Sequence, residues 1–170
     1  GKIINAKFFI GSKINFAENI FSKINYSKSA TFVSENGFKE KRTWKEMYDN
    51  TSKIIQYYRG ISIKEKDRIA AYTPNQIETV EFFLATSSIG AIWSTCSPDF
   101  GSQGVIERFS QIKPKVLIIT DRYYYNGKEI NVIQRLPLIL KKIKSIKNEI
   151  NLNYPGKKFL KYKKIKGVKI

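Results

Sequence analysis

The strongest constraint on the fold is a short run of apolar residues, Val116-Leu117-Ile118-Ile119, which follows Pro114. A strand that is apolar on both faces is expected where helices cover both sides of a parallel sheet. Two further candidate strands precede it, at 68–72 and 91–96, and helical patterns separate the three. The order strand, helix, strand, helix, strand predicts an α/β fold in which a layered sheet is flanked by helices.

The segment before these strands carries signals for a hairpin and a long helix. Short β-prone segments lie on either side of Asn36-Gly37, a dipeptide that favours a tight turn between two strands. Thr43 and Glu46 then have the spacing of a capping box, in which each side chain accepts a hydrogen bond from the other residue's backbone amide. Apolar residues follow at three- and four-residue spacing, and the helix is expected to end at Gly60.

Three further helices are predicted along the rest of the chain. Asn75 together with Glu78 is expected to cap the first of them. The second should stop before Pro114, because the residue before a proline disfavours helical geometry. The third falls within residues 130–150, where Pro137 is expected to interrupt it.

Composition excludes several kinds of catalytic site. The sequence contains no histidine, which excludes Ser-His and Cys-His pairs and histidine-ligated metals. No glycine-rich loop ends in Lys-Ser or Lys-Thr, so a standard phosphate-binding loop is absent as well. Cys96 is the single cysteine, which rules out an internal disulfide and favours a reducing, cytoplasmic setting. We expect Cys96 to be a buried structural thiol, and we predict no catalytic residue and no metal ligand.

Few polar side chains stand where a ligand site would form. Asp67 and Asp99 are the carboxylates nearest to predicted strand ends, and turn or cap hydrogen bonds are the simpler explanation for both. Tyr123-Tyr124-Tyr125 is able to stack on a base, although most aromatic clusters in such folds serve packing. The residues by themselves therefore predict an incomplete α/β domain and no specific activity.

The net charge of +17 is concentrated toward the end of the chain. Residues 128–170 contain 13 Lys and Arg against Glu129 and Glu149, which gives +11 for this part. A basic tail of this kind would bind nucleic acid or a membrane surface. Lys, Ile and Asn are abundant throughout the chain, however, which favours basic side chains spread over solvated faces. We therefore expect neither nucleic acid nor a membrane as a partner.

Three stretches resemble the acetoacetate–CoA ligases, a branch of the adenylate-forming acyl-CoA synthetases. Residues 7–19 are similar to the opening motif of the short-chain enzymes. Residues 88–101 resemble a core motif of the acetoacetate branch, with Ser-Pro-Asp-Phe-Gly where the acetate branch has Phe-Gly-Gly-Phe-Ser. Residues 123–128 resemble the Tyr-Asn-Gly-Lys signature of the same family. The resemblance covers residues 7 to about 136 and is poor beyond them.

This resemblance implies the first part of the large N-terminal domain of an adenylate-forming enzyme. Residues 1–29 would be an irregular or helical lead-in, and residues 30–170 a partial AMP-binding-type α/β domain that stops before the ATP-binding motifs. The complete enzyme would use ATP and Mg²⁺ to activate acetoacetate, and would then transfer the acyl group to CoA. Its catalytic groups would lie in the rest of its own polypeptide, so this part is expected to be inactive alone.

Two candidate CoA-binding segments follow from the same resemblance. Tyr125-Asn126-Gly127-Lys128 corresponds to a stretch that lies against the nucleotide end of CoA. There Lys128 would keep one cation for the 3′-phosphate, while Tyr125 would replace another. Ser97-Pro98-Asp99 corresponds to a loop near the pantetheine channel. A solvated Lys128 and a purely structural loop remain open as explanations.

Two other interpretations stay open at this level. The chain is also compatible with a ligase that uses acetate or propionate instead of acetoacetate. A stand-alone α/β binding module with a basic tail is a third possibility. That module would show steeply salt-dependent nucleic-acid binding through residues 139–170.

Overall fold

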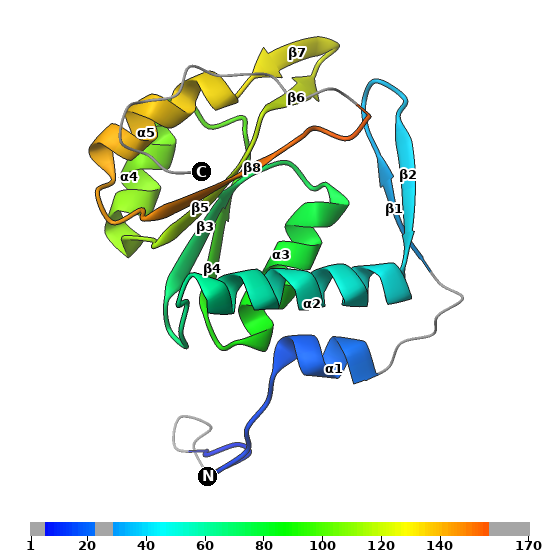
Figure 1. The fold of residues 1–170 in the computed structure, drawn as a ribbon, viewed down its shortest axis with the longest axis vertical. Helices are drawn as coiled ribbons and strands as arrows, with labels where there is room; N and C mark the ends of the chain where they lie inside the picture. Colours follow the sequence, from blue (N-terminus) through cyan, green and yellow to red (C-terminus); the bar gives the residue numbers. More distant parts are fainter. Residues whose placement is uncertain (1–5, 23–28, 157–170) are drawn as a thin grey trace.

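A four-stranded parallel sheet forms the centre of the protein, with the strand order β4-β3-β5-β8 (Figure 1). The computed structural model describes residues 6–22 and 29–156. The strands are β3 (Arg68–Tyr72), β4 (Ile92–Cys96), β5 (Val116–Thr120) and β8 (Asn148–Leu152). Every residue of β5 is buried, as expected for a strand covered on both faces. The predicted layered α/β fold is confirmed.

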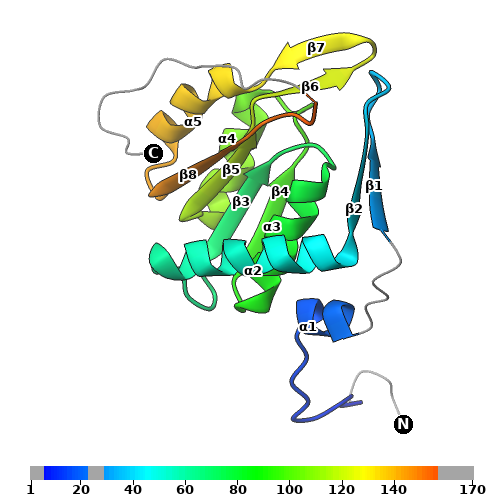
Figure 2. The ribbon, with the colours of Figure 1, turned by 45° about the vertical axis from the view of Figure 1, so that its right-hand side comes forward.

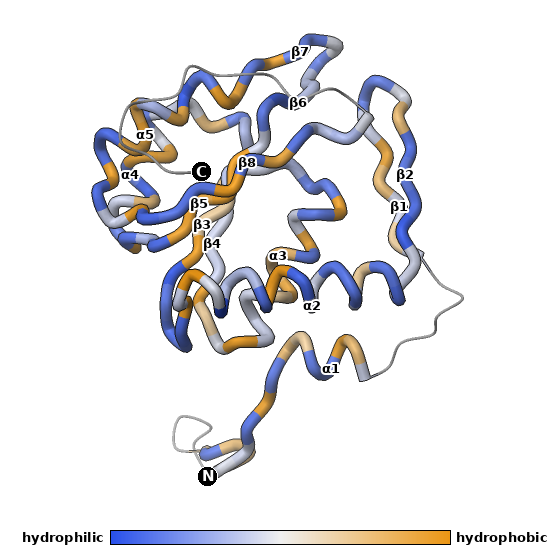
Figure 3. The backbone as a smooth tube through the Cα atoms, in the orientation of Figure 1, coloured by the Kyte–Doolittle hydropathy of each residue, from blue (hydrophilic) through white to orange (hydrophobic). Residues whose placement is uncertain are grey.

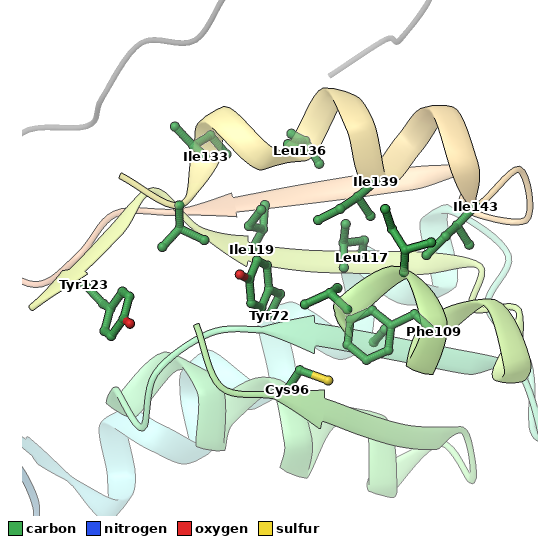
Figure 4. Packing of buried hydrophobic residues seen from close by; sticks show 14 of the residues in the cluster. Tyr72, Cys96, Phe109, Leu117, Ile119, Tyr123, Ile133, Leu136, Ile139 and Ile143 are labelled. Carbon is green, nitrogen blue, oxygen red and sulfur yellow. The ribbon is translucent and has the colours of Figure 1, made fainter. Parts of the chain in front are cut away.

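Two pairs of helices cover the two faces of the sheet (Figure 2). One face packs against α2 (Trp44–Gly60) and α3 (Ile77–Ser88), and the other against α4 (Ser102–Ile112) and α5 (Leu136–Lys142). Because side chains alternate along a strand, odd and even positions of β3 serve different faces. Buried strand residues facing α2 and α3 are Ile69, Ala71, Val116 and Ile118. Those facing α4 and α5 are Ala70, Tyr72, Leu117 and Ile119 (Figure 4).

The hairpin and the first long helix form as predicted. Strands β1 (Ser29–Val33) and β2 (Lys39–Thr43) pair antiparallel, and the hydrophilic sequence of β2 contrasts with the apolar β3 and β5 (Figure 3). At the start of α2, Thr43 Oγ1 accepts a hydrogen bond from Glu46 N at 3.2 Å, and Glu46 Oε2 accepts one from Thr43 N at 2.7 Å. The helix ends at Gly60, and Ile61 caps it.

Arg42 fastens this hairpin to α3. From β2, its guanidinium donates hydrogen bonds to Glu78 at 2.8 Å and to Glu81 at 3.0 Å, and it also pairs with Glu40. Asn50 on α2 donates a further bond to Glu81 at 3.0 Å. Glu81 is only 2% exposed, so its carboxylate depends on these donors for the hydrogen bonds that water would otherwise give.

The short helix α1 (Phe16–Ser22) packs against α3. The rings of Phe16 and Phe83 lie 5.3 Å apart between centroids. Asn15, just before α1, donates a hydrogen bond to the carbonyl of Ser87 at 3.0 Å. This part of the predicted lead-in is therefore in contact with the sheet-bearing part. The boundary between residues 29 and 30 remains a prediction.

The predicted cap of α3 is wrong. Gln76, not Asn75, is the N-cap residue, and its side chain makes no capping bond. Glu78 does not serve a capping box here, because its carboxylate faces Arg42 and the side-chain amide of Gln76. A tertiary ion pair has taken the side chain that the local pattern assigns to the helix end.

The prediction for residues 130–150 is also corrected. A 3₁₀ turn, η2 (Ile133–Arg135), leads into α5, and Pro137 stands in the first turn of α5 instead of interrupting a longer helix. Proline suits that position because the first amides of a helix have no intrahelical partner to lose. The end of the predicted helical segment is strand β8.

A second hairpin joins β5 to η2, and only its turn residues signal it in the sequence. Strands β6 (Arg122–Tyr125) and β7 (Lys128–Asn131) pair antiparallel around Asn126-Gly127. Asn126 and Gly127 have φ values of 50° and 71°. Positive φ at both central residues is what a type I′ turn requires, and Asn-Gly is its preferred sequence.

Candidate functional site at the carboxyl edge of the sheet

The carboxyl ends of the four parallel strands meet at one edge of the sheet. The chain runs from β3 to β4 on one side and then returns to β5 on the other side of β3. In open α/β sheets, ligands bind outside the carboxyl ends of the strands at such a reversal. The segments that leave the sheet there are 73–76, 97–101, 121–131 and 153–156. Both predicted CoA-binding segments belong to this edge.

The loop that follows β4 turns its polar side chains outward. Ser97 and Asp99 are exposed, and Pro98 between them is buried. Ser97 Oγ donates a hydrogen bond to Asp99 Oδ2 at 2.7 Å, and Phe100 N donates one to Ser97 O at 3.1 Å. This local hydrogen-bonded turn is the structural role expected for Asp99, and it leaves both polar side chains at the surface.

The carbonyls of the same loop are held from the opposite side by two distant residues. Arg135 Nη1 donates to the carbonyl of Pro98 at 2.9 Å and to that of Phe100 at 3.0 Å. It also bonds the hydroxyl of Tyr72, which donates to the Pro98 carbonyl at 3.3 Å and to the Phe100 carbonyl. The loop is thus anchored to the last residue of β3 and to the turn before α5.

The side chains of Tyr72, Tyr123 and Cys96 lie near this loop, in the core on the face of the sheet that α4 and α5 cover. In Figure 4, Tyr123 lies beyond the arrowheads of the strands and Tyr72 lies between it and Phe109. Burial and a hydrogen bond to Asp99 raise the pKa of Tyr123 to about 12, so its hydroxyl stays protonated at neutral pH. Burial also raises the pKa of Cys96, which is 4% exposed. Cys96 is therefore a buried, unreactive thiol, as predicted.

The second predicted segment forms the tip of the β6–β7 hairpin. Tyr125, Asn126, Gly127 and Lys128 are all exposed, and Tyr125 keeps 57% of its surface accessible. The turn geometry explains Asn126 and Gly127 without any ligand. Tyr125 and Lys128 are exposed side chains of the tip whose presence the turn itself does not require.

The hairpin is connected to the loop after β4 through its first strand. Tyr123, on the strand that carries Tyr125, hydrogen-bonds to Asp99. The two predicted segments are thus linked by one intervening side chain. No direct bond joins Ser97-Pro98-Asp99 to the hairpin tip within residues 29–156.

Asp121 fixes the base of the hairpin. It is completely buried, and its Oδ1 accepts a hydrogen bond from Tyr154 N at 2.8 Å. Its Oδ2 faces Arg122 Nε at 3.2 Å, and its carbonyl accepts from Val132 N and Ile133 N at 2.9 and 3.0 Å. One residue therefore joins the ends of β5, β7 and β8, which gives the exposed tip a rigid base.

Three residues that build this edge were not predicted from the sequence. Tyr72, Asp121 and Arg135 hold the loop and the hairpin, yet Arg135 lies 35 residues from Phe100 and 63 from Tyr72. No local pattern reports contacts at such separations. Asp121 offers a weak signal, since it is the polar residue that directly follows the fully buried strand β5.

No candidate metal-binding cluster is found in the described part of the chain. Within residues 6–22 and 29–156, no three His, Cys, Asp or Glu side chains are grouped so that they would hold a metal ion. We assign no step of the reaction to a metal ion held by these residues. No helix among these residues is long and apolar enough to cross a membrane.

Known proteins share both the sequence and the fold. Residues 23–166 match the family described as AMP-binding enzyme. The acetoacetyl-coenzyme A synthetase of Rhizobium meliloti is 42% identical over 142 residues, which are 84% of this chain and 22% of that protein. The acetoacetyl-CoA synthetase of Gallus gallus is 38% identical over 150 residues, or 87% of this chain and 22% of that protein.

A solved structure agrees with these relatives. The acetoacetyl-CoA synthetase from Streptomyces lividans superposes with a TM-score of 0.71 at 29% identity, over 75% of this chain and 20% of that one. The chain thus spans about a fifth of the length of the curated relatives it matches. The family match extends over most of the sequence, and the shared fold includes the parallel sheet. The chain belongs to the AMP-binding enzyme family.

Proposed function

We propose that this chain supplies the amino-terminal part of an ATP-dependent ligase that converts acetoacetate and CoA to acetoacetyl-CoA. The observation that carries the proposal is the 42% identity to an acetoacetyl-coenzyme A synthetase over 84% of the chain. Because the chain spans about a fifth of that relative, the reaction belongs to the complete protein. The compartment we propose for it is the cytoplasm.

The proposed reaction has two steps. A carboxylate oxygen of acetoacetate attacks the α-phosphorus of ATP, which forms acetoacetyl-AMP and releases pyrophosphate. The CoA thiolate then attacks the acyl carbon, and AMP leaves with the electron pair of the broken C–O bond. Negative charge develops on phosphate oxygens in the first step and is stabilised by cationic groups. We assign those groups to the rest of the polypeptide, since this sequence has no glycine-rich phosphate-binding loop.

The part of the reaction that we assign to this chain is contact with CoA. Lys128 offers an exposed ammonium at the hairpin tip, and an ammonium binds phosphate as a compact point charge. Tyr125 beside it offers an accessible ring and hydroxyl to the nucleotide end. Ser97 and Asp99 offer polar side chains to the pantetheine arm. The shared position of the two segments at the carboxyl edge supports this assignment.

The proposal is tested with the chain alone and with a chimera. In the chimera, this chain replaces the matched 142-residue region of the Rhizobium meliloti enzyme. We expect the chain alone to show no acetoacetate-dependent exchange between ATP and pyrophosphate. The chimera should catalyse that exchange and should prefer acetoacetate to acetate.

Two results would contradict the proposal. Exchange by the chain alone would mean that the essential groups lie within these 170 residues. A folded chimera that lacks acetoacetate-dependent exchange would mean that this chain does not serve an acetoacetate ligase. Circular dichroism of both proteins provides the folding control.

A further inference from the structure

We propose that Arg135 is a positioning residue that holds the Ser97–Gly101 loop in the shape needed to meet CoA. The role of the loop in CoA binding rests on the proposed function, whereas the restraint by Arg135 rests on the structure alone.

Three contacts of Arg135 converge on its Nη1. Its two hydrogens are shared among three acceptors, the carbonyls of Pro98 at 2.9 Å and Phe100 at 3.0 Å and the hydroxyl of Tyr72. Hydrogen bonds from a charged donor are about twice as strong as those between neutral groups. All these acceptors are neutral oxygens, so the guanidinium restrains the backbone of the loop without pairing with a carboxylate.

Tyr72 restrains the same two carbonyls from a second element, strand β3. Its side chain is fully buried at the end of β3, and the Arg135 guanidinium carbon lies 5.9 Å from its ring centroid. Burial raises the pKa of Tyr72 despite the opposing hydrogen bond from Arg135, so its hydroxyl remains a donor to the same two carbonyls. Each carbonyl therefore faces two donors that come from different elements.

The backbone of Arg135 is itself well anchored. Arg135 lies two residues after Ile133 and directly before Leu136. These two side chains are 1% and 0% exposed in the core between the sheet and α5. A side chain that starts from a packed helix entry holds its guanidinium more precisely than one on a mobile loop. On the solvent side, Arg108 lies over the Phe100 ring, 4.3 Å from its centroid.

In this arrangement the backbone of the loop is held by the protein, while its polar side chains face solvent. Its carbonyls point toward Arg135 and Tyr72, and the side chains of Ser97 and Asp99 are exposed. Without Arg135 the loop would lose its attachment to the turn before α5 and keep the bonds from Tyr72, so its local turn would open more often. Arg135 therefore acts on a ligand through the loop and need not touch the ligand itself.

The first test measures the loop in the 170-residue chain by amide hydrogen exchange. We compare wild type with Arg135→Gln, and we use Lys142→Gln as the control because Lys142 is an exposed cation at the far end of α5, the helix that Arg135 precedes. Arg135→Gln should raise exchange of the Phe100 amide about ten- to hundredfold more than it raises exchange of the β5 amides, which report global unfolding. Arg135→Lys, which keeps a cationic donor, should raise it less.

The second test measures CoA use in the chimera with the Rhizobium meliloti enzyme. Arg135→Gln should raise KM for CoA about tenfold or more, with acetoacetate-dependent exchange between ATP and pyrophosphate unchanged. A residue that merely stabilised the fold would lower both activities together, because it would reduce the amount of folded enzyme.

The outcomes separate the two claims. Unchanged exchange of the Phe100 amide in Arg135→Gln, or equal acceleration throughout the sheet, would overturn the positioning role. Faster loop exchange combined with an unchanged KM for CoA would overturn its link to CoA. A wild-type chimera without any ligase activity would count against the proposed function, while the exchange data on the chain would still decide the restraint.

Discussion

Two arginines fasten distant segments in this protein, and they do so in different ways. Arg42 joins the β1–β2 hairpin to α3 through carboxylates, among them the buried Glu81. Arg135 joins the loop after β4 to the turn before α5 through carbonyls and a hydroxyl. A carboxylate in the interior needs its cation, whereas a neutral loop carbonyl that loses one of two donors loses much less. We conclude that Arg42 supports global stability and that Arg135 supports local geometry.

The largest effect is expected from Arg42→Ala. Its loss leaves the carboxylate of Glu81 buried with only Asn50 as a donor, so the free energy of unfolding should fall by about 3 kcal/mol. Urea denaturation measures this change, with Lys41→Ala on the same strand as the exposed control. In the double variant with Glu81→Gln, part of the loss should be recovered. A loss below about 1 kcal/mol would make this pair no different from a surface salt bridge.

Arg135→Gln is expected to cost less in global stability. The lost bonds are to neutral acceptors, and Tyr72 still donates to the two carbonyls, so the free energy of unfolding should fall by about 1.5 kcal/mol. The same denaturation experiment, with Lys142→Gln alongside, gives the comparison. If Arg135→Gln destabilised the protein more than Arg42→Ala, the distinction between the two arginines would be lost.

Tyr72→Phe should have a smaller effect still. The ring continues to fill the core between the sheet and α4, and Arg135 still donates to the Pro98 and Phe100 carbonyls. Removing the hydroxyl should therefore cost about 1 kcal/mol or less. A cost greater than that of Arg135→Gln would show that the hydroxyl contributes more to holding the loop than the guanidinium does.

The two regions should also respond differently to pH. Burial raises the pKa of Glu81, against the hydrogen bonds from Asn50 and Arg42 that lower it. The folded state then binds a proton more tightly than the unfolded state, so Glu81 favours folding as the pH falls through its raised pKa toward 4.5. Relative to Glu81→Gln, wild type should gain stability over that window. The cost of Arg135→Gln should stay constant from about pH 5 to 8, since its acceptors do not titrate there.

Three of the four strands of the sheet were predictable because their signals are local, whereas β8 begins inside the segment predicted to be helical. The apolar run of β5, the capping box of Thr43 and the Asn36-Gly37 turn each lie within a few consecutive residues, and all three predictions are confirmed. The failed cap at Asn75 shows the limit of such signals. There the tertiary partner Arg42 competes for Glu78, and no window of neighbouring residues contains it.

The candidate site was predictable only in part. Resemblance pointed to Ser97-Pro98-Asp99 and Tyr125-Asn126-Gly127-Lys128, and the fold places both at the carboxyl edge. Their contact with CoA remains a prediction. Arg135 and Asp121 hold these segments through hydrogen bonds to residues more than 30 positions away in the sequence, which local patterns do not reveal.

The most direct test of the account compares CoA with 3′-dephospho-CoA in the chimera. We propose that Lys128 at the exposed tip binds the 3′-phosphate. The chimera with wild-type Lys128 should therefore have a higher kcat/KM for CoA than for 3′-dephospho-CoA. Lys128→Ala should reduce the ratio of the two kcat/KM values about fivefold, without changing kcat/KM for 3′-dephospho-CoA. A ratio that is the same in wild type and Lys128→Ala would contradict the assignment of this edge to CoA.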